Sequence, residues 1–249
     1  MEPALSRAAP VIFKKAVPST NTVLKQLIPM SPPEGLVLTA ARQLSGRGRL
    51  GRSFESPEGG LYLSMLLYPQ CSPESLGSLT PCAAVAARRA IEHCCGLSCG
   101  IKWPNDLLFK GKKLCGILTE VSFFRDKCCV VLGVGINVNS DIAAFPAELY
   151  ESACSLAGAL GRKLELEALA RTLIEELDLM YSRWKAEPGA FLAEYRAHCV
   201  SLGRDVLLQR GEEKREAFAL DVDGSYALIV DIDGKKERVF MGEASLREK

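Results

Sequence analysis

The residues from Gly46 to Arg52 limit most strongly how this chain can fold, because they read Gly-Arg-Gly-Arg-Leu-Gly-Arg. Three guanidinium groups stand among three glycines, with no acidic side chain between them. Glycine lets a backbone approach an anion closely, and each arginine offers a planar fork that matches carboxylate or phosphate geometry. A segment so poor in apolar residues cannot be buried in a core. We therefore predict a surface loop that binds an anion and is mobile without its ligand.

Two other kinds of site share features with this loop. The stretch from Gly46 to Ser53 departs from a nucleotide-binding P-loop by an arginine in the lysine position, but a P-loop opens a helix. Residues 54 to 60 contain a proline and a glycine pair, and residues 61 to 68 have a strand pattern. A nucleic-acid segment would need a basic chain, whereas this chain has 31 Lys and Arg against 30 Asp and Glu. We reject both, and a solvated charged loop remains the structural alternative.

The length of 249 residues suits one large domain or a main domain with a small one. A hydrophobic fraction of 48% is ordinary for a globular protein. No apolar run approaches the ~18 residues of a membrane span, and residues 1 to 7 lack the basic and apolar regions of a signal peptide. We expect a cytoplasmic protein that does not bind membranes.

Ten cysteines are present, but they do not have the spacing of a zinc site. Two pairs are adjacent in sequence, no C-x-x-C occurs, and His93 and His198 are the only histidines. Without a secretory signal, such cysteines are expected to be reduced thiols that pack as small apolar residues. We predict no metal site.

A helix is predicted over residues 22 to 28, where the apolar residues recur at helical spacing. Ser19 or Thr20 is its expected N-cap. The same helix start is expected to present hydroxyl and amide groups to a small polar ligand. A buried strand over residues 35 to 41 leads to Gln43, whose side-chain amide can both donate and accept beside the anion loop. Residues 75 to 95 are predicted to form a helix that faces the core.

A hairpin is predicted over residues 101 to 121, with its turn at residues 110 to 112. The first strand stops at a proline, and Asn105 and Asp106 follow it. Lys113 lies on the returning strand, and Gly116 would let a ligand approach that strand.

A further buried strand is predicted over residues 128 to 139. Its glycines, Gly133 and Gly135, do not make a dinucleotide fingerprint, because the third glycine is missing and no helix follows at once. We expect this strand to pass closely under a ligand.

Together these motifs resemble those of the biotin protein ligase family. The matching segments are Ser19-Thr20-Asn21, Gln43 with Gly46-Arg47-Gly48-Arg49-x-Gly51-Arg52, Lys102-Trp103-Pro104-Asn105-Asp106, Lys113-Leu114-x-Gly116-Ile117-Leu118, Gly133-x-Gly135-Ile136-Asn137, and Gly242-Glu243-x-Ser245-Leu246-Arg247. They occur in the family's order over nearly the whole chain. The sequence departs from the family at Phe54, where tryptophan is frequent, and at Pro18, where an acidic residue is frequent.

The remaining sequence fits the fold that this resemblance implies, an α+β catalytic domain of the class II synthetase-like kind. Its mixed sheet with flanking helices would span residues 1–200. Helices are predicted over residues 164 to 185 and from residue 191. Residues 201–249 would form a small SH3-like β-barrel. Its strands are predicted at residues 205–209, 216–222, 226–232 and 238–241.

The resemblance implies a two-step reaction. Biotin attacks ATP, with Mg²⁺ escorting the pyrophosphate, to give biotinyl-AMP. The biotinyl group then passes to a lysine of a biotin carboxyl carrier protein domain. The implied catalytic residues are Arg47, Arg49, Asp106 and Lys113. The implied binding residues are Ser19, Thr20, Asn21, Gln43, Gly46, Arg47, Gly48, Arg49, Arg52, Trp103, Asn105, Lys113, Gly116, Gly133, Gly135 and Asn137. For Asp106, a purely structural role as the cap of a turn remains an alternative.

The resemblance also concerns partners. Bifunctional relatives carry an N-terminal DNA-binding domain, and fewer than twenty residues precede Ser19 here, so a ligase without a DNA-binding role is expected. A homodimer is left open. A lipoate ligase and a non-catalytic biotin-binding module are the two alternative functions, although the latter would not need Lys113 or the loop arginines.

Overall fold

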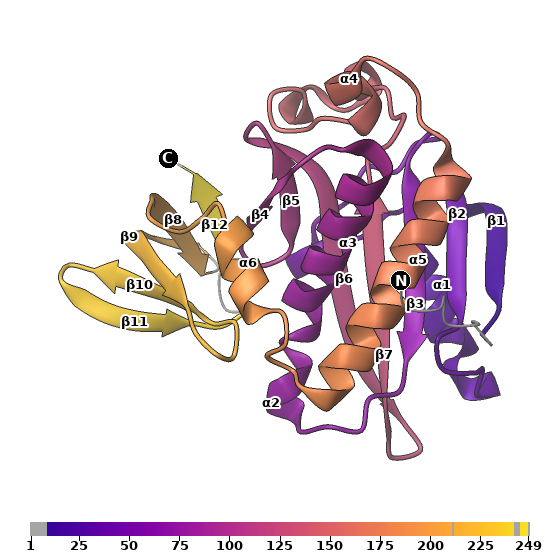
Figure 1. Cartoon of the computed structure of the whole chain (residues 1–249), viewed down its shortest axis with the longest axis horizontal. Coiled ribbons are helices and arrows are strands. Elements are labelled where there is room, and N and C mark those ends of the chain that lie inside the picture. Colours follow the sequence, from indigo (N-terminus) through magenta and orange to yellow (C-terminus); the bar gives the residue numbers. More distant parts are fainter. Residues whose placement is uncertain (1–8, 211, 242–244, 249) are drawn as a thin grey trace.

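The computed structural model describes residues 9–210, 212–241 and 245–248. It contains a large sheet of seven strands, with helices on both faces, and a smaller sheet of five strands beside it (Figure 1). Gly242 and Glu243 of the last family motif lie outside the described residues, as do the residues examined for a signal peptide.

The large sheet has the spatial order β1-β2-β3-β7-β6-β5-β4. The first two strands run parallel and every other neighbouring pair is antiparallel, so the sheet is mixed, as predicted. Its strands are β1 (Val11–Val17), β2 (Val37–Gln43), β3 (Leu61–Leu67), β4 (Gly100–Lys102), β5 (Asp106–Phe109), β6 (Lys112–Phe124) and β7 (Lys127–Ile136).

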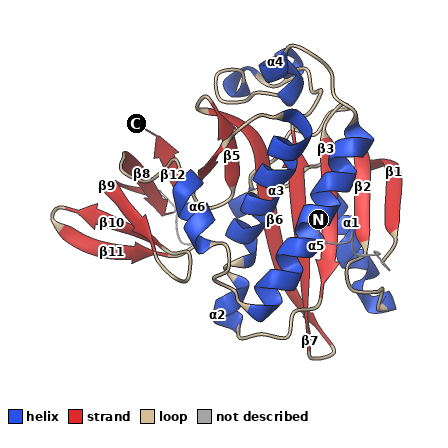
Figure 2. Cartoon of the chain, viewed as in Figure 1, coloured by secondary structure: helices blue, strands red, loops and turns tan. Residues whose placement is uncertain are grey.

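The centre of this sheet is covered on both faces, because every residue of β3 is buried. Helices α3 (Leu79–Cys95) and α5 (Leu166–Ala186) cover one face together, and their apolar residues form the main core with the sheet (Figure 2). Helix α1 (Thr20–Leu27) packs on the opposite face, where Leu24 and Ile28 join a second, smaller core.

Three other short helices and four 3-10 turns complete the main unit. They are α2 (Pro73–Leu76), α4 (Leu156–Leu160), α6 (Leu192–His198), and the 3-10 turns η1 (Ile28–Met30), η2 (Arg49–Gly51), η3 (Ile142–Ala144) and η4 (Ala147–Leu149). The helix predicted over residues 75 to 95 is thus two helices, which separate at Gly77 and Ser78. The Ser78 side chain there donates to the Ser75 carbonyl at 2.6 Å, which stabilises a turn between them.

The hairpin predicted over residues 101 to 121 is in fact three strands. Strand β4 reverses at once into β5, which pairs with β6. The first reversal falls at Trp103 to Asn105 and includes a cis Trp103–Pro104 peptide bond. A proline cannot donate to a strand ladder, so the strand ends there, as predicted, and the chain turns back.

The smaller sheet is antiparallel in the order β11-β10-β9-β8-β12. Its strands are β8 (Asp205–Arg210), β9 (Glu213–Val222), β10 (Leu228–Ile232), β11 (Lys235–Val239) and β12 (Ser245–Glu248). Strands β8, β9 and β10 match predicted strands, because alternating apolar residues and Asp-Gly turns mark them. Strand β11 begins earlier than predicted and shares only residues 238 and 239 with the strand predicted at 238–241. Strand β12 was not predicted, since a four-residue segment carries too little pattern.

All ten cysteines are free thiols. Burial raises the pKa of Cys82 to about 12 and that of Cys99 to about 12, so both remain protonated. Over the residues that the structure describes, no group of three or more His, Cys, Asp or Glu side chains is arranged to hold a metal ion. No described helix is long and apolar enough to cross a membrane.

Candidate ligand site

The Arg/Gly loop is a small hairpin in its own right. Arg47 and Ser53 form an antiparallel bridge, and the amide of Gly48 donates to the carbonyl of Arg52 at 2.7 Å. The tip turns through Leu50 and Gly51, which have φ values of 54° and 74°. Backbone hydrogen bonds therefore give the segment a definite shape although it has almost no apolar residues.

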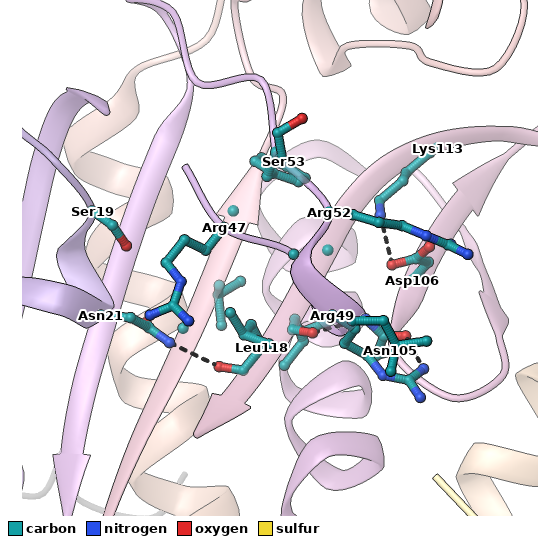
Figure 3. Close-up of a pocket in the computed structure, with 18 of the residues that line it drawn as sticks. Ser19, Asn21, Arg47, Arg49, Arg52, Ser53, Asn105, Asp106, Lys113 and Leu118 are labelled. Atoms are coloured by element: carbon teal, nitrogen blue, oxygen red, sulfur yellow. Dashed lines mark hydrogen bonds and ion pairs between the residues drawn. The ribbon is translucent and has the colours of Figure 1, made fainter. Parts of the chain in front are cut away.

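This loop covers a cavity of about 130 Å³ that opens to solvent (Figure 3). The lining residues come from the start of α1, the end of β2, the loop, the β4–β5 turn, β6 and β7. Of the residues predicted to bind substrate or to act in catalysis, those that line the cavity are Ser19, Thr20, Asn21, Gln43, Arg47, Gly48, Arg49, Arg52, Trp103, Asn105, Asp106, Lys113, Gly116, Gly133 and Gly135.

Two predicted residues do not line the cavity. Gly46 lies at the base of the loop, where an added Cβ would collide with the carbonyl oxygen of Phe54. Asn137 is buried, and its Nδ2 donates to the carbonyl of Cys154 at 3.0 Å, so it holds a neighbouring segment. The sequence pattern marked both positions, but neither lies at the cavity surface.

One end of the cavity is polar and uncharged. The backbone amide of Thr20 donates to Oε1 of Gln43 at 2.8 Å, and Nε2 of Gln43 donates to Oγ of Ser56 at 2.9 Å. These bonds fix the orientation of the Gln43 amide. Ser19 occupies the N-cap position of α1, but its hydroxyl makes no capping hydrogen bond. This buried hydroxyl is therefore not used by the helix.

Asn21 extends the same end toward the sheet. Its Nδ2 donates to the carbonyl of Leu118 at 3.2 Å, and its Oδ1 accepts from Oγ of Ser64 at 2.5 Å (Figure 3). A Cβ at Gly133 would collide with the Asn21 Oδ1. The predicted close approach to this strand is thus made by Asn21.

The opposite end of the cavity is cationic. Arg49 donates from Nη1 to Oδ1 of Asn105 at 3.0 Å, and Nδ2 of Asn105 donates to the carbonyl of Ile117 at 2.8 Å. Burial lowers the pKa of Arg49, and the nearby carboxylate of Asp106 acts in the opposite direction. The loop arginine is thereby held against the β4–β5 turn.

Lys113 and Asp106 form an ion pair in which Nζ lies 2.8 Å from Oδ1. The two residues lie on neighbouring strands, β6 and β5. The Lys113 ammonium also lies 5.5 Å from the centre of the Phe54 ring, within the range of a cation–π contact. Asp106 therefore forms an ion pair with a lysine in this structure. The sequence had suggested a catalytic role or a role as the cap of a turn, but not this ion pair.

The glycines of β6 and β7 form a flat floor, because Gly116 and Gly135 are partners across the two strands. A Cβ at Gly135 would lie 2.7 Å from the Phe54 ring, so the ring needs this glycine. Phe54 also meets Tyr62 edge to face, with ring centres 6.5 Å apart. The family departure at position 54 thus lies inside the site.

Two site residues were missed from sequence. The Ser64 hydroxyl, at the centre of β3, is within hydrogen-bonding distance of both Thr20 and Asn21, and a serine among apolar strand residues was the available signal. Glu120 accepts from Asn21 at 3.0 Å and lies on β6, seven residues after Lys113. A carboxylate within a half-buried strand was the signal for it.

Residues 13–137 match the model of the biotin/lipoate A/B protein ligase family. The chain belongs to this family. Its relatives include the bifunctional ligase/repressor BirA of Bacillus subtilis (strain 168), which is 40% identical over 95% of this chain and 74% of the relative. The biotin–[acetyl-CoA-carboxylase] ligase of Mycobacterium tuberculosis is 31% identical over 84% of this chain and 78% of the relative.

Among solved structures of the family, the biotin protein ligase from Aquifex aeolicus in complex with biotin and ATP is similar to this chain. The TM-score is 0.82 and the identity is 29%, over 96% of this chain and 99% of the other. The family resemblance inferred from the sequence motifs is therefore confirmed, and so is the α+β fold.

Proposed function

We propose that this chain is a biotin–protein ligase, which activates biotin with ATP and transfers it to a protein. One observation carries this conclusion: a neutral polar end and a cationic end share one cavity. Thr20 and Gln43 at the first end suit a ureido ring, which both donates and accepts hydrogen bonds. Arg49, Arg52 and Lys113 at the second suit a carboxylate joined to a phosphate, and Arg47 lies toward Asn21.

In the first step a biotin carboxylate oxygen attacks the α-phosphorus of ATP. A carbonyl–O–P bond forms, the bond to the leaving oxygen breaks, and pyrophosphate departs. Both reactants are anions, so their approach is opposed by charge repulsion. Arg47, Arg49 and Lys113 offset this repulsion and the charge that develops on the transferred phosphoryl oxygens.

Magnesium is proposed to accompany ATP in this step. Among the described residues that line the cavity, Asp106 carries the only carboxylate, and it is paired with Lys113. The described lining of this cavity therefore does not offer the cluster of oxygen ligands that would hold the ion on its own. Mg²⁺ commonly keeps several waters and binds through substrate phosphates, which fits such a site.

In the second step the amine of an acceptor lysine attacks the carbonyl carbon of biotinyl-AMP. An amide bond forms and AMP leaves. The acceptor is protonated at neutral pH, because the pKa of a lysine side chain is about 10.4, so a base must take a proton. We assign this role to Asp106, which the phosphate would free by attracting Lys113. The acceptor is proposed to be a biotin carboxyl carrier protein domain.

The test is to incubate the protein with Mg-ATP, a carrier domain, and either biotin or lipoate. The mass of the carrier is then measured by mass spectrometry. We expect modification by biotin only. Modification by lipoate alone would show that the acid was misassigned, and modification by neither would favour a binding module. A carrier whose acceptor lysine is replaced by arginine is the control.

Other properties of the chain are also proposed. We place the domain boundary near residue 200, since strands β8 to β12 pair only among themselves within the described residues.

The near balance of 31 basic and 30 acidic residues supports a ligase that does not bind DNA. The ten free thiols support a cytoplasmic location. Gel-shift assays and cell fractionation test the last two proposals.

A homodimer is proposed through the edge strand β1. This strand ends the large sheet, and Phe13 and Val11 on it are 68% and 49% exposed. An exposed apolar edge strand can pair with another copy of itself. Light scattering of wild type and Phe13→Lys should show a dimer and a monomer, respectively, and a monomeric wild type would contradict this proposal.

A further inference from the structure

The carboxylate of Glu120 lies next to the cavity without lining it. Its Oε1 is 3.1 Å from Nζ of Lys25 and 3.1 Å from Nη1 of Arg47, and its Oε2 accepts from Nδ2 of Asn21 at 3.0 Å. The side chain is 14% exposed. Burial alone would raise the pKa of Glu120, but hydrogen bonds from Asn21 and Lys25 and the two positive charges lower it. The group is therefore ionised at neutral pH.

These contacts connect the Arg/Gly loop to the uncharged end of the cavity. Arg47 turns toward Asn21, whereas Arg49 turns toward Asn105 (Figure 3). The loop is thus held at two points, on β6 through Glu120 and on the β4–β5 turn through Asn105. The cavity lies between these two points.

The ion pair with Glu120 leaves Arg47 able to bind a substrate. A guanidinium has five N–H donors, and Glu120 contacts Nη1, so other donors can face an incoming carboxylate. Glu120 does not line the cavity, and the positive charges of Lys25 and Arg47 offset its negative charge. The arrangement therefore orients Arg47 without placing a carboxylate on the cavity wall.

We propose that Glu120 is a positioning residue for biotin capture, which holds Arg47 so that the loop covers the cavity before biotin arrives. This inference rests on the proposed function, since it names biotin as the ligand. A purely structural alternative exists, in which Glu120 serves only to neutralise Lys25 of α1. The proposal predicts that the Arg/Gly loop opens more readily when Glu120 is replaced. The structural alternative predicts no change in the loop.

The first experiment measures biotin binding directly by calorimetry, without turnover, in wild type, Glu120→Gln and the matched control Lys25→Met. Arg47 is half exposed, so solvent weakens its ion pair. We expect the Kd for biotin to rise roughly tenfold in Glu120→Gln, and to stay within about twofold of wild type in Lys25→Met. Equal effects in both variants would favour the structural alternative and overturn the proposal.

A double-mutant cycle isolates the pair. In an Arg47→Met background, Glu120→Gln should have no further effect on biotin binding, because the contact that it removes is already absent. If Glu120→Gln weakened biotin binding in the Arg47→Met background as much as it does in wild type, Glu120 would act through a residue other than Arg47. Since Arg47 is also proposed to act in adenylation, a fall in kcat in Glu120→Gln is compatible with the proposal, but the KM for biotin should rise as well, and a fall in kcat with KM unchanged would overturn the role in biotin capture.

Limited trypsin digestion gives a readout that needs no biotin. Cleavage after Arg49 and Arg52 should be faster in unliganded Glu120→Gln and Arg47→Met than in wild type or Lys25→Met. Bound biotin with Mg-ATP should slow it in wild type. If the melting temperature of Glu120→Gln is far below that of wild type, the digestion of Arg47→Met is used in its place. Equal cleavage in all four proteins would overturn the proposal, whereas a wild type that binds no biotin would refute only the proposed function.

Discussion

The indole Nε1 of Trp103 donates a 3.0 Å hydrogen bond to the carbonyl oxygen of Tyr226. Trp103 lines the cavity, and Tyr226 belongs to the β9–β10 connection of the smaller sheet. The backbone amide of Trp103 also donates to Oγ of Ser201 at 3.0 Å. The turn that presents Asn105 and Asp106 is therefore supported by residues of the C-terminal part.

Replacing Trp103 by phenylalanine should weaken both stability and nucleotide binding. The buried Tyr226 carbonyl would lose its partner, which costs about 1–3 kcal/mol of unfolding free energy. The KM for ATP should rise, since the turn beside the cavity loses its support. Trp184→Phe is the matched control, because its Nε1 bonds to Oγ of Ser78 away from the cavity. Denaturant unfolding and initial rates would measure both effects. An ATP KM equally raised in the control would contradict this account.

Replacing Lys113 by alanine should slow adenylation by about two to three orders of magnitude. The ammonium is the cation that the structure places against Asp106 at the cavity wall, and melting temperature should change little. Lys112→Ala is the control, since that side chain points to Glu151, 3.9 Å away. Pyrophosphate exchange measures the rate. A Lys113→Ala rate within a few-fold of wild type would show that this lysine does not act in adenylation.

Replacing Gly133 by alanine should abolish tight biotin binding, because the new methyl group would displace the Asn21 amide. Asn21 is buried and hydrogen-bonded to Ser64 and Leu118, so the amide cannot move cheaply. Gly224→Ala is the control, since nothing lies within 4 Å of its added Cβ. Calorimetric titration would compare the two. Unchanged binding in Gly133→Ala would mean that Asn21 does not shape the ligand site.

Acid should destabilise the protein through Glu194, among other groups. Burial would raise its pKa, but hydrogen bonds and charges of Arg89 and Arg88 lower it below the ordinary 4.5. A carboxyl with a lowered folded-state pKa stabilises the fold above its unfolded pKa, and this contribution is lost as pH falls through the folded value. Glu194→Gln should therefore show a shallower loss of melting temperature below about pH 4.5. Glu151→Gln, at a side chain that is 98% exposed, should follow wild type. Parallel curves of melting temperature against pH for all three proteins would show that Glu194 does not contribute to the acid sensitivity.

The sequence predicted elements better than it predicted their pairing. Strand β3 and helix α5 have strong periodic patterns, and both lie within one or two residues of the predicted ranges. The pairing of β3 with β7 was not predicted, because apolar strands of this kind carry no signal for their partners.

The site was predicted where ligand chemistry requires unusual residues. The arginines, Lys113 and Gln43 stood out by charge or by an amide at a strand end, and all line the cavity. Glu120 did not stand out, since its partner Arg47 is distant in sequence. Asn137 stood out but does not line the cavity, and its Nδ2 donates to Cys154. Side-chain contacts across distant segments depend on the tertiary fold, which local patterns do not contain.

The pairing of β3 with β7 also determines the order in which the chain can fold during synthesis. Leu61 to Leu67 leave the ribosome long before Ile136 does, and they contain seven uncharged residues that are all buried in the finished fold. Until β7 emerges, this strand has an open edge, which is the kind of segment that associates with other chains. We infer that the nascent protein depends on chaperones during this interval. A chain stopped after Asp126 should aggregate at concentrations at which the full chain stays in solution, and a soluble, monomeric truncated chain would contradict this inference.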